Sequence, residues 1–296
     1  MVILVNMIGI IGIGQMGKPF AKNISKCGYP LIVWNRTIEK AKSVLGPGID
    51  LADSPADLAK KADIIILMLS NNEAVEHVIF SDNGIYPELN SGKIVIDMST
   101  LSPTFSIDVS KRISKKGAFY LDAPVIGSVP QAERAELTIL VGGNYEKFNS
   151  VLYIFKCLGK NIFYLGPNGS GLSMKMVNNV VMGGNLEILS EALSLGESLG
   201  LDRKTMLDII SLGSANSRIL ELKRENLINN EYEPAFKLQH EEKDLYYALD
   251  MARVSKTVMP ATAVIHEIYK YGLSKNKGDR DISFIFKILK ELSGKD

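Results

Sequence analysis

A glycine-rich turn near the beginning of the chain restricts its fold more than any other feature. Residues 12–17 match the pattern G-x-G-x-x-G, directly after an apolar run at residues 8–11 and before a helical pattern. In such a turn the first glycine permits a tight bend, the second lets the backbone approach a pyrophosphate, and the third allows close packing of helix on strand. Glycines alone mark any tight turn, but this strand–turn–helix context predicts a dinucleotide-binding loop. We assign to it the residues Gly12, Gly14, Gln15, Met16 and Gly17.

The first half of the chain alternates apolar runs with helical patterns, which is typical of a parallel sheet covered by helices. After Gly169 no strand-like run appears, and a long helical pattern extends from about Gly171 to Leu199. We therefore predict an α/β Rossmann domain with a mostly parallel, doubly wound sheet over residues 1–167, joined by that long helix to an all-helical C-terminal domain over residues 168–296. The expected strands are residues 8–11, 31–34, 64–68, 94–98, 120–123, 137–141 and 162–165.

The composition argues against several classes of partner. The formal net charge is +1, whereas a protein that binds nucleic acid or an anionic membrane surface carries a basic surplus. The apolar stretch at residues 169–186 contains a lysine and three asparagines, which makes it a poor membrane span. Cys27 and Cys157 are too few for a disulfide framework or a metal site, so we expect no metal and reduced thiols in the cytoplasm. Residues 7–12 already supply a first strand, and we expect Met1–Asn6 to be dispensable.

The end of the second expected strand indicates which dinucleotide is preferred. A carboxylate at this place would bind the ribose 2′-hydroxyl of NAD and repel a 2′-phosphate. The chain has Asn35, Arg36 and Thr37 there instead. Arg36 can form paired hydrogen bonds with a phosphate and Thr37 can donate to it, which predicts a preference for NADP(H). The alternative is that Arg36 is one more solvated arginine.

Lys175 is the only charged residue between positions 169 and 186. An unpaired ammonium inside such an apolar helix would be costly to bury, and Asn178 and Asn179 follow on the same helical face. A face of this kind usually lines a cleft, where partial desolvation would lower the pKa of the lysine and suit it to donate a proton to a carbonyl oxygen. The residues alone leave open that the lysine stem packs while its head reaches water.

Five separated segments of the chain, in the same order, resemble the β-hydroxyacid dehydrogenases, a family that includes 3-hydroxyisobutyrate dehydrogenase and glyoxylate/succinic semialdehyde reductase. The resemblance covers nearly the whole chain. The segments are the glycine loop at 12–17, D-x-S-T at 97–100, D-A-P-V-x-G-S at 122–128, G-x-G-x-x-x-K-x-x-x-N at 169–179 and F-x(6)-K-D-L at 236–245.

The resemblance implies an NADP(H)-dependent oxidoreductase that interconverts a small semialdehyde acid and a 3-hydroxyacid by hydride transfer. Lys175 would act as the general acid or base, and Asn179 would orient it or a substrate hydroxyl. The substrate carboxylate would be held by Thr100 and by the backbone amides of Gly127 and Ser128. The active site would lie in the cleft between the two domains.

The same resemblance places Thr100, Phe236 and Lys243 beside the nicotinamide. We also assign Leu69 and Ser70 to cofactor binding. Asp244 would anchor its helix. Taken without the family, Phe236 is interpreted as a core residue, and Lys243 and Asp244 as part of a solvated helix face.

One departure from the family concerns the substrate. Ile126 stands where most members have serine, which should disfavour substrates rich in hydroxyls near the carboxylate. Two other functions remain as alternatives: an imine reductase, a group that typically lacks the lysine, and a non-catalytic NADP-binding module. Because the long helix is apolar on most of its faces, we also expect a homodimer or homotetramer.

Overall fold

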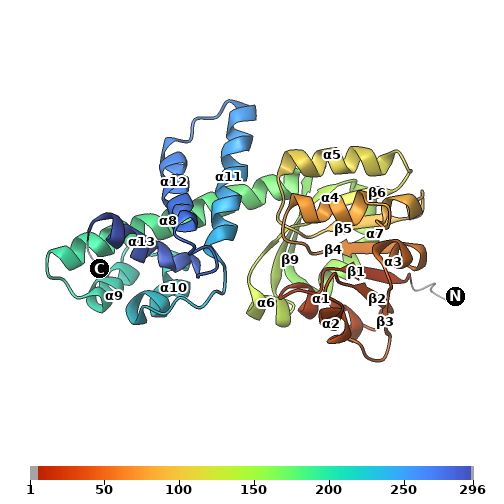
Figure 1. Cartoon of the computed structure of the whole chain (residues 1–296), viewed down its shortest axis with the longest axis horizontal. Coiled ribbons are helices and arrows are strands. Elements are labelled where there is room, and N and C mark those ends of the chain that lie inside the picture. Colours follow the sequence, from red (N-terminus) through yellow and green to blue (C-terminus); the bar gives the residue numbers. More distant parts are fainter. Residues whose placement is uncertain (1–5, 295–296) are drawn as a thin grey trace. The chain divides into compact units, whose positions relative to one another are not determined.

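The computed structural model describes residues 6–294, and the chain falls into two compact units that divide after Lys175. Figure 1 shows the long helix α8 (Ser170–Ser198), which begins in the first unit and continues into the second. The prediction for Met1–Asn6 lies outside the described residues except for Asn6, which is exposed.

Within the described residues, the first unit contains a nine-stranded sheet with the order β3-β2-β1-β4-β5-β6-β8-β7, and β9 pairs with β8. Its strands are β1 (Ile8–Ile11), β2 (Leu31–Trp34), β3 (Ile49–Leu51), β4 (Ile64–Leu67), β5 (Ile94–Asp97), β6 (Phe119–Asp122), β7 (Val125–Ile126), β8 (Leu137–Gly143) and β9 (Gly159–Gly166). The first six strands pair in parallel, whereas β8 is antiparallel to β6 and β7 and parallel to β9. The predicted Rossmann fold with a mostly parallel sheet is confirmed.

The order of the strands positions the glycine turn. β1 lies between β2 and β4, so the chain crosses from β1 toward one edge of the sheet and later returns to its other side. Ligands of such sheets bind beyond the carboxyl ends of the strands at this switch point. The glycine turn at residues 12–17 directly follows β1 and therefore lies there.

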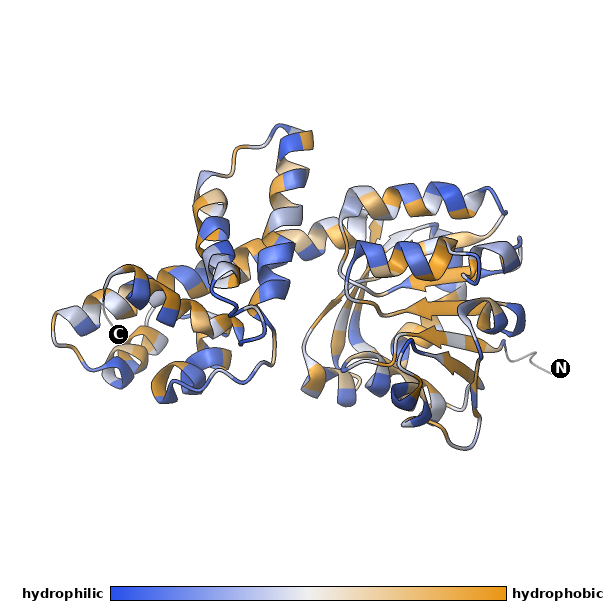
Figure 2. Ribbon diagram, in the orientation of Figure 1, coloured by the Kyte–Doolittle hydropathy of each residue, from blue (hydrophilic) through white to orange (hydrophobic). Residues whose placement is uncertain are grey.

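Helices cover both faces of the sheet. They are α1 (Gly17–Lys26), α2 (Ile38–Lys42), α3 (Pro55–Lys61), α4 (Asn72–Phe80), α5 (Pro103–Ser114), α6 (Val129–Glu133) and α7 (Tyr145–Lys156), with a 3₁₀ turn η1 at Tyr86–Glu88. One hydrophobic core includes Phe20 of α1 and Phe155 of α7, and the other includes Leu58 of α3 and Val109 of α5. Because both faces are buried, the central strands are continuous apolar runs, which Figure 2 shows in orange.

The second unit consists of helices in the described residues, with α8 followed by α9 (Arg203–Leu212), α10 (Arg218–Asn229), α11 (Leu238–Ser255), α12 (Pro260–Ser274), the 3₁₀ turn η2 (Ile282–Phe284) and α13 (Ile285–Leu292). Its main core gathers Leu186 of α8, Leu245 of α11, Tyr269 of α12 and Ile285 of α13. In residues 6–294 no helix is long and apolar enough to cross a membrane.

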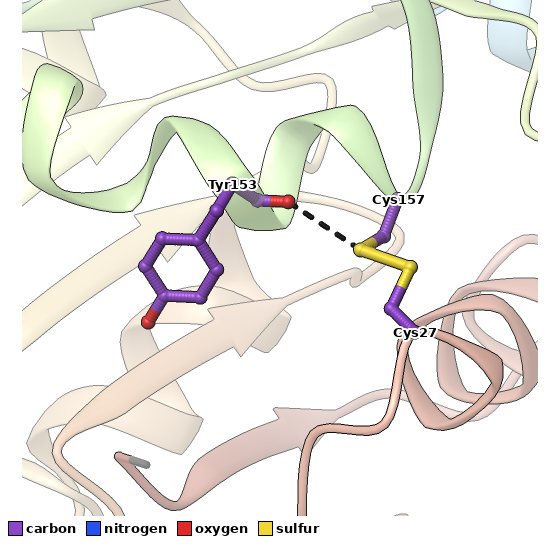
Figure 3. The surroundings of a disulfide bond; sticks show 3 residues. All are labelled: Cys27, Tyr153 and Cys157. Carbon is purple, nitrogen blue, oxygen red and sulfur yellow. Dashed lines mark hydrogen bonds between the residues drawn. A yellow bond between two sulfur atoms is a disulfide. The ribbon is translucent and has the colours of Figure 1, made fainter. Parts of the chain in front are cut away.

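Cys27 and Cys157 form a disulfide, with their Cα atoms 6.3 Å apart (Figure 3). Each cysteine directly follows a helix, α1 and α7 respectively, and these helices contribute to the same core on one face of the sheet. Tyr29 follows Cys27 by two residues and Tyr153 precedes Cys157 by four, and the centroids of their rings lie 5.0 Å apart. The expectation of two reduced thiols is therefore wrong. The two cysteines give no support for a reducing compartment. The pairing depends on two helix ends that meet only in the folded domain.

Candidate functional site

The glycines of the turn after β1 meet two different steric demands. Gly12 has a φ of +104°, and a Cβ atom added to it would collide with the carbonyl oxygen of Met68. A Cβ atom on Gly17 would collide with the carbonyl oxygen of Gly12. Gly14, in contrast, has no atom of the described structure within 4 Å of such a Cβ. Two glycines thus allow close packing, and the middle one leaves open space for a ligand.

The beginning of α1 is suited to an anion. Among the described residues, no side chain caps the helix at Met16, and its first turn contains no acidic residue. The unsatisfied N–H groups and positive dipole end of a helix N-terminus favour phosphate. The residues of this loop therefore fit the pyrophosphate of a dinucleotide.

The three residues after β2 that are predicted to select the cofactor differ in their contacts and exposure. Asn35 is a bracing residue: its Oδ1 accepts the Ile13 N–H at 2.9 Å, and its Nδ2 donates to the Thr37 carbonyl oxygen at 2.8 Å. Arg36 and Thr37 are exposed. The first two positions after the strand, Asn35 and Arg36, thus present an amide and a guanidinium where a carboxylate would select NAD.

A buried carboxylate organises the carboxyl ends of β4 and β5. Ser99 Oγ accepts the Leu69 N–H at 2.8 Å, and Asp97 Oδ1 accepts the Ser99 N–H at 2.9 Å. Tyr120 donates its hydroxyl to Asp97 Oδ2 at 3.0 Å. Burial raises the pKa of Asp97 to about 6, although its hydrogen bonds oppose the shift. Of the predicted residues here, Leu69 and Thr100 are half-buried and Ser70 is exposed, and the supporting role of Asp97 and Ser99 was not predicted.

The predicted carboxylate-binding turn is already hydrogen-bonded in part. Gly127 is exposed and has a φ of +131°, which favours glycine. Ser128 donates both its backbone N–H and its hydroxyl to Gln131 Oε1, at 3.0 and 2.7 Å. This contact belongs to a capping box at the beginning of α6, which was not predicted. The Ser128 amide can therefore hold a substrate carboxylate only after the Gln131 side chain turns away.

Lys175 is 8% exposed, so the structure favours a buried side chain over one that extends into solvent. It lies on the second turn of α8, five residues after the helix begins at Ser170. The start of α8 is held by Asp122 at the end of β6, which accepts the backbone N–H groups of Gly169 and Leu172. The sheet therefore fixes the helix turn that precedes the lysine.

The second unit brings together Asn179 of α8 with Lys243 and Asp244 of α11. Asn179 is 1% exposed, donates to Asp244 Oδ2 at 2.7 Å and accepts from Asn178 Nδ2 at 3.0 Å. Lys243 Nζ lies 3.2 Å from Asp244 Oδ1. Asp244 is itself 1% exposed, so the interpretation of this residue as part of a solvated helix face is wrong. Its hydrogen bond with Asn179 joins α11 to α8.

Phe236 is half-buried and packs against the main core of the second unit. Its backbone N–H donates to Asp281 Oδ2 at 3.3 Å, and the same oxygen lies 2.7 Å from Lys223 Nζ. Asp281 is fully buried. Sequence reasoning missed this carboxylate because its partners are distant in sequence and largely backbone groups.

The His, Cys, Asp and Glu side chains of residues 6–294 form no group of three that could hold a metal ion. The described residues thus provide an open turn suited to phosphate, the buried Lys175, and the buried pair of Asn179 and Asp244.

Comparisons with known proteins give a consistent result over nearly the whole chain. Residues 7–166 match a family model described as the NAD binding domain of 6-phosphogluconate dehydrogenase. Residues 169–289 match one described as NAD-binding of NADP-dependent 3-hydroxyisobutyrate dehydrogenase.

Two curated relatives are similar over most of their own length. Glyoxylate/succinic semialdehyde reductase 1 of Arabidopsis thaliana is 35% identical, over 96% of this chain and 98% of the relative. Mitochondrial 3-hydroxyisobutyrate dehydrogenase of Rattus norvegicus is 36% identical, over 96% and 87%. Among solved structures, 3-hydroxyisobutyrate dehydrogenase of Mycobacterium tuberculosis with L-serine has a TM-score of 0.86 at 25% identity, and the match covers 97% of this chain and 100% of that one.

Proposed function

Since the chain belongs to the β-hydroxyacid dehydrogenase family, we propose that it transfers hydride between NADP(H) and the carbonyl carbon of a small semialdehyde acid, with Lys175 as general acid and base. The family makes it an NAD(P)-dependent hydroxyacid dehydrogenase. The observation that carries the finer proposal is the burial of Lys175 on a helix turn that the sheet anchors.

The residues of the chain have separable tasks in this reaction. When bound, the nicotinamide supplies the hydride in reduction and accepts it in oxidation. Lys175 donates a proton to the carbonyl oxygen as negative charge develops on it, and takes the proton back in the reverse direction. Asn179, held by Asp244, orients the lysine or the substrate hydroxyl. Thr100 and the backbone at Gly127 hold the substrate carboxylate.

Two alternatives make different predictions in one assay. An imine reductase would act on cyclic imines in preference to aldehyde acids, and a non-catalytic module would bind NADPH without consuming it. Lys175 and the substrate turn favour the aldehyde acids. The test is the fall in absorbance when purified protein and NADPH are mixed with succinic, methylmalonic, malonic or tartronate semialdehyde, with glyoxylate, or with a cyclic imine. Turnover of the imine alone, or of none, would contradict the proposal.

Ile126 is expected to set the ranking of these substrates. It follows Val125 in β7 and replaces the hydroxyl usual at this position with an apolar side chain. The missing donor should lower kcat/KM for hydroxyl-rich substrates by roughly one to two decades. Succinic, methylmalonic or malonic semialdehyde should therefore rank above tartronate semialdehyde, and glyoxylate should be poor. Ile126→Ser should shift the ranking toward tartronate semialdehyde, and a ranking led by that substrate in the unmodified protein would refute the role of Ile126.

Arg36 is expected to select NADPH. Arg36→Ala should weaken NADPH binding by roughly 10–100-fold and NADH binding by less than about threefold, because only NADPH carries the 2′-phosphate. The measurement is the dissociation constant of each cofactor from nicotinamide fluorescence. Lys26→Ala serves as the control. It removes an equal charge from the last turn of α1, at the end of the helix away from the glycine turn. Equal losses for both cofactors would show that Arg36 does not contact the phosphate.

The same proposal includes self-association. One face of α8 carries apolar side chains that are each more than half exposed, at Val177, Val181, Ile188 and Leu195. Apolar rows of this length on a helix are usually covered. They support a homodimer or homotetramer.

A further inference from the structure

We propose that Asp122 is a positioning residue for the reaction, because its carboxylate fixes the first turn of α8 against the carboxyl end of β6 and so sets where Lys175 presents its amino group. The inference rests on the proposed catalytic role of Lys175.

The carboxylate joins the sheet to the helix through both of its oxygens. Asp122 is the last residue of β6 and is fully buried. Its Oδ1 accepts the Gly169 N–H at 2.7 Å, and its Oδ2 accepts the Leu172 N–H at 3.1 Å. These amides belong to the end of a helix whose first N–H groups have no partner within the helix. One side chain thus fixes both the position and the rotation of the first turn.

The backbone around this carboxylate is packed so closely that glycine is required. A Cβ atom on Gly171 would collide with the Leu140 carbonyl oxygen and lie 3.0 Å from Asp122 Oδ2. A Cβ atom on Gly142 would lie 2.6 Å from Asp122 Oδ1. Gly169 has a φ of +91°, a conformation that other residues rarely adopt. The start of α8 therefore has little freedom to shift while these contacts persist.

The charge of Asp122 suits this role. Burial raises the pKa of its carboxyl, and the N–H groups of Gly169 and Leu172 oppose the shift because they favour the ionised form. An asparagine at this position would have nearly the same size, but one of its two terminal atoms would be an NH₂ group facing a backbone N–H donor. The substitution would therefore release one of the two contacts.

Leu172 precedes Lys175 by three residues, which is about one turn of an α-helix. Any movement of the first turn is transmitted to the lysine, because the hydrogen bonds between turns keep a helix rigid. Proton transfer is sensitive to such movement: a displacement of about 1 Å can cost on the order of 10²-fold in rate.

Two substitutions disturb the contact between Asp122 and the start of α8, one in the carboxylate and one in the helix. Asp122→Asn removes an acceptor, and Gly171→Ala forces the helix away from Leu140 without changing any charge. Each should lower kcat by roughly 10–100-fold, with KM and the dissociation constant of NADPH within about threefold of the unmodified protein. Gly184→Ala is the matched control on the same helix, because its Cβ atom would meet only Ile265 Cδ1 at 3.7 Å, and its kcat should stay unchanged.

Hydrogen exchange supplies a readout that does not depend on activity. In Asp122→Asn the amides of Gly169 and Leu172 should exchange at least about tenfold faster, while amides farther along α8 keep their protection. If Asp122→Asn leaves both kcat and the exchange rates unchanged, the positioning role is wrong. Loss of NADPH binding in this variant would also overturn it, because Asp122 would then be needed for the structure of the whole first unit. If Lys175→Met keeps the kcat of the unmodified protein, the proposed function fails instead, and the exchange result still decides whether Asp122 fixes the helix.

Discussion

Lys175→Met is expected to lower kcat by roughly 10²–10⁴-fold and to leave the dissociation constant of NADPH within about twofold. Methionine keeps most of the volume and the apolar stem of the buried side chain but cannot give a proton to the carbonyl oxygen. The residues that we propose for binding the dinucleotide do not include Lys175, so NADPH binding should persist. The measurements are steady-state kcat with the best semialdehyde and NADPH binding by fluorescence.

Lys93→Met provides the matched control, because Lys93 is also a buried lysine of the first unit. Its Nζ donates to the carbonyl oxygens of Ala59 and Ala62 at 2.6 and 2.7 Å, at the end of α3. This substitution should reduce the melting temperature and leave kcat unchanged. A Lys175→Met protein that keeps more than about a tenth of the original kcat would contradict the assignment, since general acid catalysis contributes at least 10²-fold.

Removal of the disulfide is expected to have the largest effect on stability. Cys27 and Cys157 are 130 residues apart in sequence, and a cross-link that closes a loop of this length restricts the unfolded chain strongly. Cys27→Ser should lower the free energy of unfolding by roughly 3–5 kcal/mol and the melting temperature by on the order of 10 °C. Treatment of the unmodified protein with dithiothreitol should give the same melting temperature as Cys27→Ser. If thiol titration of the unfolded, unreduced chain finds two free thiols, the bond is absent and this prediction fails.

Much of the sheet could be predicted because buried parallel strands are continuous apolar runs. β1 and β2 have the bounds expected from the sequence, Ile8–Ile11 and Leu31–Trp34. β3 and β7 were not predicted, since they contain three and two residues and are too short to show a pattern. The disulfide was missed for a related reason: nothing local to either cysteine indicates that α1 and α7 end side by side.

Among site residues, those that contrast with their surroundings could be found from the sequence. Lys175 is the only charged residue between positions 169 and 186, and the glycines of the turn follow a strand at a fixed spacing. Gln131 follows Ser128 at the spacing of a capping box, which is visible in the sequence. Asp122 and Asp281, in contrast, accept hydrogen bonds largely from backbone N–H groups of distant segments. Any residue can supply such an N–H group, so the sequence carries no mark of these contacts.

The most direct test of the central claim uses NADPH that carries deuterium at both positions of nicotinamide C4, and follows this label into the product. The unmodified protein should pass this deuterium to succinic or methylmalonic semialdehyde, and mass spectrometry should find the hydroxyacid product one mass unit heavier. Lys175→Met should bind the labelled cofactor and form almost no labelled product. Unlabelled product, or labelled product formed equally fast by both proteins, would contradict hydride transfer assisted by Lys175.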